Sequence, residues 1–438
     1  MGKMLDTRMF WRVFFFTVLL LVNYCGAFSV RDVDPADVSK LQEIRDENEF
    51  LTICYYADWV VFRRGKGHFE PEEILYQHCT HIVYVFAVLD DETKDRMIPG
   101  EPTIDIEENL FARVTELKKY GPKVLLGLGG WVDSTPKYGE MLRSNELRQH
   151  LVQQISDFLI HHNFDGLEVD LSFPGAYQGN ETSGTPQDKD YYLSFLRELR
   201  EHFDVKAHQL KIDRLLLTIS GPTTNKMIDI GYLVPGILTL CDWIEVLTYD
   251  FHGFWENRTG LVAPFSAQPG DELYDEEEVG NVQSGMDVWI KHGAPPSKLV
   301  LGIPFYGRTF LLTDSNMTDI NSPAEGEPDE GEYTRYLGYL SYYEIMDRVQ
   351  KKDWTVVHKE NVGSYAYKGN QWVGFDDKYD VAVKADYVKQ KGFRGAAIWT
   401  LGLDCFQKNC PAGQHPLLTT VRGVLTGDIE LKDVTNYL

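Results

Sequence analysis

The chain has 438 residues, of which 43% are hydrophobic and 25% are charged, and this composition is ordinary for a globular protein with a large core. Its formal net charge of −23 argues against nucleic acid or an anionic membrane surface as the main partner. Such an acidic surface indicates solubility and little more.

The first 27 residues have the layout of a secretory signal peptide. Lys3, Arg8 and Arg12 precede an apolar run at 13–22, and small residues lead to an expected cleavage after Ala27. The run is short for a membrane span, so we expect a soluble, extracellular protein, with an uncleaved anchor as the alternative. N-glycosylation triplets at Asn180, Asn257 and Asn316 agree with export.

Apolar runs alternate with helical patterns along the chain. In chain order they predict strands at 52–62 and 81–89, a helix at 109–121, a strand at 123–131, a helix at 147–163, a strand at 164–173, a helix at 190–203, strands at 214–221 and 242–251, a helix at 286–293, a strand at 298–307, a helix at 382–392 and a strand at 395–403. Such alternation indicates a parallel sheet, and eight strands favour a closed (β/α)8 barrel over a doubly wound open sheet. We expect the barrel to span residues 28–425, with a tail at 426–438.

One segment interrupts this alternation. Residues 313–380 are polar at first and then rich in tyrosine, with alternating residues at 364–377. We expect a small α+β insertion domain between the seventh and eighth strands of the barrel.

The strand at 164–173 carries an unusual set of acidic residues. Asp165, Glu168 and Asp170 lie in an apolar frame, and buried carboxylates are costly unless they are paired or functional. Residues at a spacing of two share a face, so Glu168, Asp170 and Ser172 should all point into the barrel, with Ser172 nearest its mouth.

The expected carboxyl ends of the strands are rich in aromatic and charged residues. Any one of them would more often serve packing or helix capping, but together they suit a sugar-binding cleft. The set is Trp59, Phe86, Trp131, Asp170, Tyr249, Asp250, Tyr306, Arg308 and Trp399.

The stretch "FDGLEVDLSFP" at 164–174 resembles the signature of the family 18 glycoside hydrolases, the chitinases, which runs Asp-Gly-x-Asp-x-Asp-x-Glu. Other stretches resemble the family in the same order, among them "KVLLGLGGW", "LTYDFHGFWENRTG", "KLVLGIPFYGRTF" and "GAAIWTLGLD". In the family, the last glutamate of the signature protonates the glycosidic oxygen, and the middle aspartate holds the substrate acetamide that attacks the anomeric carbon. Ser172 stands at the position of that acid, Glu168 replaces the inner aspartate, and Asp170 matches the middle one.

The resemblance therefore implies a chitinase-like protein without its catalytic acid. A serine hydroxyl does not titrate near working pH, and Glu168 lies about 6–7 Å deeper along the strand. The remaining binding residues match: Trp399 under the central sugar, with Tyr55, Trp59, Phe86, Trp131, Asp170, Tyr249, Asp250, Trp255, Tyr306 and Arg308 around it. We expect a secreted, monomeric lectin for chitin or N-acetylglucosamine oligomers rather than an enzyme.

Two alternatives remain open: a residual chitin hydrolase, and a protein-interaction or growth factor with its own receptor and a vestigial sugar cleft. No metal or cofactor is expected.

Six cysteines are present, and Cys25 should leave with the signal. From sequence, Cys54 and Cys79 could join two early elements, and Cys405 and Cys410 could close a small loop. The resemblance supports the first pair. It leaves the second family disulfide in doubt, because Met346 stands at one of its cysteines, and Cys405–Cys410 is a substitute. Cys241 is expected to be a buried free thiol.

Overall fold

A closed parallel barrel forms the centre of the computed structural model, which describes residues 49–271, 280–410 and 412–434. Its eight strands are β1 (Leu51–Ala57), β2 (His81–Leu89), β4 (Lys123–Gly129), β5 (Gly166–Asp170), β6 (Leu216–Gly221), β7 (Ile244–Val246), β8 (Leu299–Pro304) and β14 (Gly395–Trp399). β1 pairs in parallel with both β2 and β14, which closes the barrel and excludes the open sheet. The strands are apolar along nearly their whole length because they are covered on both faces.

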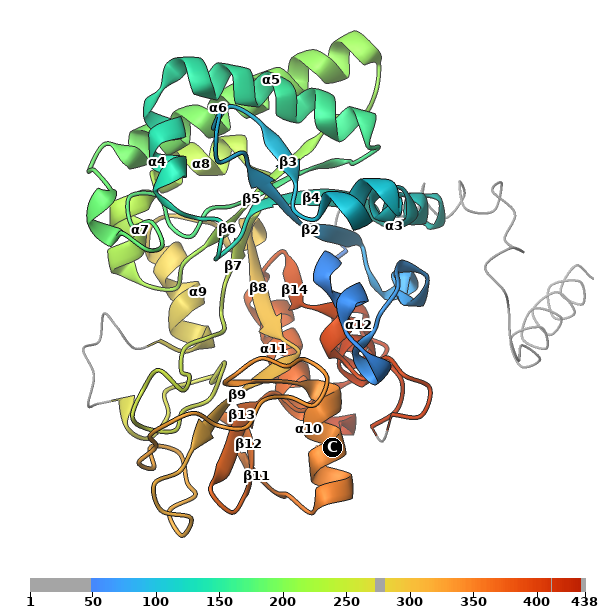
Figure 1. Ribbon diagram of the computed structural model, residues 1–438, viewed down its shortest axis with the longest axis vertical. Coiled ribbons are helices and arrows are strands. Elements are labelled where there is room, and N and C mark those ends of the chain that lie inside the picture. Colours follow the sequence, from blue (N-terminus) through green and yellow to red (C-terminus); the bar gives the residue numbers. More distant parts are fainter. Residues whose placement is uncertain (1–48, 272–279, 411, 435–438) are drawn as a thin grey trace, which may run out of the picture. The chain divides into compact units, whose positions relative to one another are not determined.

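Helices surround the barrel, as the alternating pattern predicted. They are α3 (Leu110–Thr115), α4 (Pro136–Arg143), α5 (Asn145–His161), α6 (Asp188–Leu210), α7 (Asn225–Gly231), α8 (Val234–Leu240), α9 (Val282–Lys291), α11 (Lys378–Lys391) and α12 (Pro416–Thr426). Figure 1 shows α4, α5, α6 and α8 on the outer side of β4–β7. A short strand, β3 (Met97–Pro99), pairs antiparallel with the carboxyl end of β2.

A second, antiparallel sheet lies between β8 and β14 in the chain (Figure 1). It contains β9 (Tyr306–Leu311), β10 (Tyr339–Ser341), β11 (Thr355–Lys359), β12 (Gly363–Lys368) and β13 (Gln371–Phe375), with helix α10 (Tyr342–Lys352). This confirms a strand-rich insertion. The prediction of a single strand at 298–307 is wrong, because β8 ends at Pro304 and β9 begins the second sheet at Tyr306.

Two other predicted strands are shorter in the structure. The strand expected at 52–62 ends at Ala57, and Asp58–Phe62 form a 3-10 turn. The strand expected at 242–251 covers only Ile244–Val246. The residues that follow each strand therefore lie on loops at the carboxyl end of the barrel, which is the end that carries active sites in folds of this kind.

The expected signal segment at 1–27, together with Cys25, lies outside the described residues. In the part of the chain that the structure describes, no helix has the length and apolar character needed to cross a membrane.

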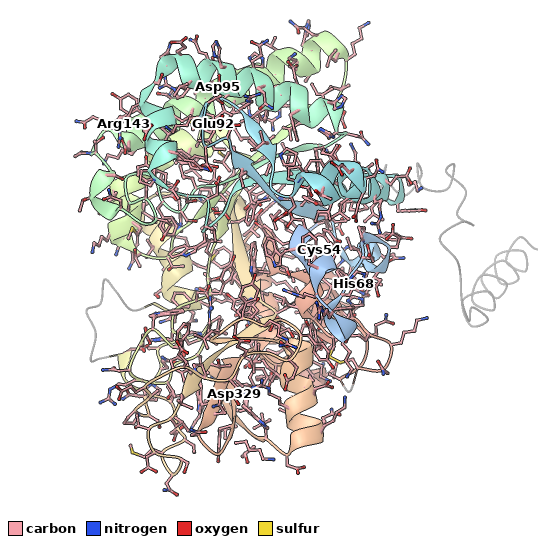
Figure 2. The ribbon with its side chains drawn as sticks, viewed as in Figure 1. Cys54, His68, Glu92, Asp95, Arg143 and Asp329 are labelled. Atoms are coloured by element: carbon pink, nitrogen blue, oxygen red, sulfur yellow. A yellow bond between two sulfur atoms is a disulfide. The ribbon has the colours of Figure 1, made fainter. Side chains whose placement is uncertain are left out.

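Two disulfides form as expected, and Cys241 is a buried free thiol. Cys54 of β1 (labelled in Figure 2) is bonded to Cys79, which precedes β2. Cys405 is bonded to Cys410 after β14.

Removal of the first disulfide should destabilise the protein more than removal of the second. The sequence separation is 25 residues for Cys54–Cys79 and 5 for Cys405–Cys410. Loop-closure entropy then predicts losses of about 3.5 and about 2 kcal/mol of unfolding free energy for the two double alanine variants. Urea unfolding of both variants measures the difference, and an equal or larger loss from the Cys405–Cys410 pair would contradict it.

Candidate functional site

Five aromatic side chains meet at the carboxyl ends of the barrel strands, and we call this set the aromatic floor. The ring of Trp399, the last residue of β14, lies with its centroid 5.1 Å from Tyr55, 6.0 Å from Phe86 and 6.4 Å from Tyr249. Trp59 lies 6.5 Å from Trp399 and 6.3 Å from Phe86. All but Tyr55 are partly exposed. The structure therefore brings together four residues that the sequence placed at separate strand ends, and it adds Tyr55, which the family resemblance implied.

Two predicted tryptophans stand outside this floor. Trp131 is 63% exposed and Trp255 is 55% exposed, which is unusual for so large an apolar ring. Trp131 makes no ring contact with any described aromatic residue, whereas Trp255 lies against the Arg308 guanidinium, 5.2 Å from its ring centroid. Exposed rings of this kind can stack on the flat face of a ligand.

Asp250, Tyr306 and Arg308 form one hydrogen-bonded group beside the floor. Arg308 donates to both carboxylate oxygens of Asp250 at 2.7 and 2.8 Å, and the Tyr306 hydroxyl donates to Asp250 Oδ1 at 2.7 Å. Tyr339 of β10 stacks on Tyr306 with ring centroids 4.6 Å apart, and Arg308 lies over both rings. Tyr339 was missed from the sequence, because only the second sheet brings β10 next to β9.

The acidic residues of β5 separate into two groups. Asp165, just before β5, pairs with Lys118 at 2.7 Å and accepts a hydrogen bond from the Val124 amide at 2.7 Å. It lies at the opposite end of the strand from Asp170 and links neighbouring elements. Glu168 and Asp170 are buried, at 1% and 7% exposure.

Asp170 is held by two serine hydroxyls. Ser220 of β6 donates to Asp170 Oδ1 at 2.5 Å, and Ser172 donates to the same oxygen at 3.1 Å. Burial raises the pKa of the Asp170 carboxyl, and these two hydrogen bonds counteract that rise. Ser220 was not singled out from the sequence, since a serine at the end of an apolar strand carries no distinctive signal.

A second acidic group lies deeper in the barrel. The Tyr55 hydroxyl contacts Glu168 Oε1 at 2.5 Å and also contacts Glu245 Oε2, while the Trp243 indole N–H donates to Glu245 Oε1 at 2.9 Å. Glu168 Oε2 has no hydrogen-bond partner among the described residues. Glu245 of β7 was missed, although an acidic residue in an apolar run was the signal that identified Glu168.

Burial keeps both glutamates from ionising in the ordinary range. Desolvation, followed by the charge of Glu245, raises the pKa of Glu168 well above its usual value. Desolvation raises the pKa of Glu245 to about 7. The only side chains that hydrogen-bond them in the described structure are Tyr55 and Trp243, so this group retains a proton near neutral pH.

The Glu245 pKa predicts a pH dependence of stability. Between about pH 4.5 and pH 7, Glu245 holds a proton in the folded protein but releases it in the unfolded chain. The contribution of Glu245 to the free energy of unfolding therefore falls as pH rises through this range. A Glu245→Gln variant cannot ionise there. Its melting temperature relative to the unmodified protein should be higher at pH 8 than at pH 5, as measured by thermal unfolding. The exposed Glu201→Gln variant is the control, and a pH-independent difference for Glu245→Gln would overturn the assignment.

One group of potential metal ligands occurs among the described residues, in the region of the second sheet. Ligand atoms of His358, Asp377 and Asp380 lie within 4.8 Å of one another. Asp377 and Asp380 form the capping box at the start of α11, and the Ser364 hydroxyl contacts His358 Nδ1 at 2.9 Å and donates to Asp377 at 2.8 Å. Helix capping accounts for the two aspartates, and the contact with Ser364 accounts for the position of His358.

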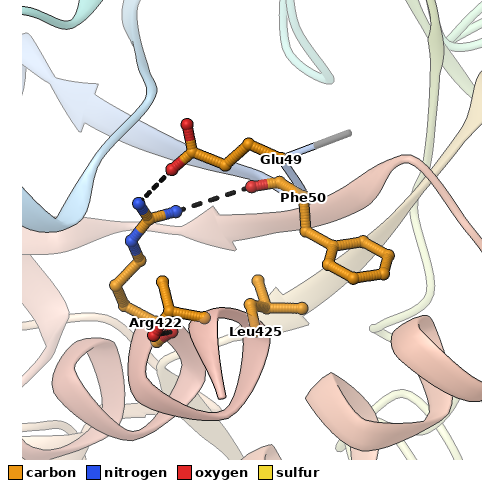
Figure 3. Close-up of a pocket in the computed structure, with 5 residues that line it drawn as sticks. Glu49, Phe50, Arg422 and Leu425 are labelled. Carbon is orange, nitrogen blue, oxygen red and sulfur yellow. Dashed lines mark hydrogen bonds and ion pairs between the residues drawn. The ribbon is translucent and has the colours of Figure 1, made fainter. Parts of the chain in front are cut away.

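A pocket of about 300 Å³, shown in Figure 3, is lined by Glu49 and Phe50, which directly precede β1. The aromatic floor lies toward the other end of that strand. Glu49 pairs with Arg422 across the pocket, and Phe50, Leu425 and Thr426 complete its lining. None of the sequence-predicted site residues lines it.

Comparison with known proteins identifies the family. The model of glycosyl hydrolases family 18 matches residues 51–404. Probable chitinase 10 of Drosophila melanogaster is 38% identical over 391 residues, which are 89% of this chain and only 17% of that protein. The endochitinase of Manduca sexta is 34% identical over 86% of this chain and 67% of its own length.

Solved structures agree. Catalytic domain 2 of the Ostrinia furnacalis Group II chitinase matches with a TM-score of 0.81 and 37% identity, over 86% of this chain and 97% of that domain. Human YKL-39, described as a pseudo-chitinase with retained chitooligosaccharide binding properties, matches with a TM-score of 0.77 and 31% identity, over 86% of this chain and 100% of that one. By sequence and by fold, the chain belongs to glycosyl hydrolases family 18.

Proposed function

We propose that this protein binds chitin-derived oligosaccharides at the carboxyl end of its barrel and does not hydrolyse them. The proposed contact surface is the aromatic floor together with Trp131, Trp255 and the Asp250–Tyr306–Arg308 group. Trp399 would stack under the central sugar ring, and Asp170 would accept a hydrogen bond from that sugar's acetamido N–H.

The observation that carries this proposal is the environment of Ser172. By the resemblance of 164–174 to the family signature, this residue corresponds to the catalytic acid. It is only 2% exposed, and its hydroxyl already donates to Asp170. An alcohol cannot protonate a leaving oxygen at neutral pH. Glu168 and Glu245 lie deeper in the barrel, where Tyr55 contacts Glu168 Oε1 and Glu245 Oε2, and Trp243 donates to Glu245 Oε1.

Calorimetric titration with chitotetraose, chitopentaose and chitohexaose tests the binding. Cellohexaose is the matched ligand control, because it has the same backbone without acetamido groups. We expect heat from the chitin oligomers and none from cellohexaose. Equal binding of both, or of neither, would contradict a site built around the acetamido group.

Residual hydrolysis is the second candidate, and two observations favour it. Asp170 is retained, and the similar proteins of Drosophila melanogaster and Manduca sexta are described as chitinases. This candidate predicts slow release of shorter oligomers, which an Asp170→Asn variant abolishes and a Ser172→Ala variant retains.

We also propose that the protein is secreted and N-glycosylated. The sequons at Asn180, Asn257 and Asn316 have exposed asparagines, which is what attached glycans require. A mass decrease after treatment with an amidase that removes N-glycans, from protein secreted by eukaryotic cells, would support this, and an unchanged mass would refute it.

A further inference from the structure

We propose that Ser172 and Ser220 form a two-hydroxyl clamp on Asp170 Oδ1, which fixes the second oxygen, Oδ2, as the acceptor for the acetamido N–H of a bound chitin oligomer. In this role Ser172 is a positioning residue rather than the remnant of a lost acid. The inference rests on the proposed function, and it adds a specific purpose for the residue that replaced the acid.

The clamp follows from the register of two neighbouring strands. Val169 of β5 is opposite Ile219 of β6, so Asp170 and Ser220, the next residue of each strand, are level and share a face. Ser220 reaches Asp170 Oδ1 from the side at 2.5 Å, and Ser172 reaches the same oxygen from its own strand at 3.1 Å. Two donors from different directions restrict rotation of the carboxylate.

Ser172 is itself held in place. Its backbone N–H donates to the Ser134 hydroxyl at 3.0 Å, and its carbonyl accepts from the Gln178 side chain at 3.4 Å. Ser134 in turn donates to the Gly130 carbonyl at 2.7 Å, which ties the clamp to the loop after β4. These contacts hold the Ser172 hydroxyl in position to donate to Asp170 before any ligand binds.

The other oxygen of Asp170 makes no hydrogen bond among the described residues, and the side chain keeps slight exposure at the end of β5. Among the described residues, the titratable groups with an electrostatic interaction with Asp170 are acids and phenols. They are Glu168, Glu245, Tyr138, Tyr192, Tyr232 and Tyr249. Burial among such groups opposes ionisation of the Asp170 carboxyl. A hydroxyl that donates a hydrogen bond to Asp170 stabilises its charged form instead.

Four single variants test the clamp through affinity for chitohexaose. Ser172→Ala and Ser220→Ala each remove one hydrogen bond to a carboxylate, so each should weaken binding by about tenfold. Ser172→Thr keeps a hydroxyl and should bind within a few fold of the unmodified protein. Ser156→Ala is the matched control, because Ser156 is a buried serine that donates to the Val152 carbonyl in α5, away from the site. If Ser172→Ala binds like Ser156→Ala, the clamp is wrong.

The titration of Asp170 gives a readout that general loss of structure would not produce. In ligand-free protein with carbon-13-labelled aspartate, the Asp170 carboxyl should titrate at higher pH in Ser172→Ala and Ser220→Ala than in Ser156→Ala. Loss of oligomer binding on acidification should move to higher pH in the same two variants. An unchanged Asp170 titration would overturn the clamp. If the unmodified protein binds no chitin oligomer, the proposed function fails, but the ligand-free titration still decides whether the clamp exists.

Discussion

Replacing Ser172 with glutamate should give the protein chitin-hydrolysing activity. The side chain would place a titratable acid beside Asp170, at the position that the resemblance of 164–174 to the family signature assigns to the acid that protonates the glycosidic oxygen. General acid catalysis of this kind contributes about 10²–10⁴-fold, so release of short oligomers from chitohexaose should rise by that order over the unmodified protein. Product chromatography of timed samples measures the rate.

The matched control is Ser172→Gln, which has the same shape but cannot donate a proton as an acid does, and which should stay inactive. Adding Asp170→Asn to Ser172→Glu should remove the new activity, because a neutral amide then replaces the charged carboxylate that holds and polarises the acetamide. Ser172 is buried, so thermal unfolding must show that each variant is folded. A folded Ser172→Glu protein that binds chitohexaose but releases no products would contradict the view that the missing acid is what prevents hydrolysis.

Replacing Trp399 with alanine should abolish most of the affinity for chitin oligomers. Trp399 contacts all the other members of the aromatic floor, so truncation removes the stacking surface and loosens its neighbours. Central aromatic residues of binding sites typically contribute 2 kcal/mol or more, which corresponds to a loss of about 30-fold or more in affinity. Calorimetry with chitohexaose measures this loss.

Trp354→Ala is the matched control, since Trp354 is a half-buried tryptophan that packs against Arg348 near α10, outside the site. It should leave chitohexaose affinity unchanged. Trp399→Phe keeps an aromatic plane and should fall between the alanine variant and the unmodified protein. Retained affinity in a folded Trp399→Ala protein would place the oligosaccharide elsewhere, or would favour a protein-interaction role with a vestigial sugar site.

The barrel and the aromatic floor could be predicted because both depend on local pattern and one topological rule. Apolar runs alternating with helical patterns specify parallel strands, and parallel strands have all their carboxyl ends at one end of the barrel. Trp399 and Tyr249 are 150 residues apart in the sequence, and they meet for that reason alone.

Features that depend on contacts between side chains could not be predicted in the same way. Tyr339 reaches Arg308 only through the pairing of β10 with β9, and nothing in the run at 298–307 indicated that its end belongs to a second sheet. Sequence adjacency groups Asp165 with the functional carboxylates, but its partners are Lys118, which follows α3, and Val124 of β4. Glu245 was visible as an acid in an apolar strand, but its link to Glu168 through Tyr55 required three strands to be placed around the barrel axis.

One measurement tests the central claim most directly. Chitohexaose is titrated into the unmodified protein in a calorimeter, and the same sample is then incubated and its oligosaccharides are identified by mass spectrometry. Saturable binding with chitohexaose recovered intact is the predicted result. Binding followed by release of shorter oligomers above a protein-free control would contradict the claim, and would mean that the site contains an acid other than residue 172.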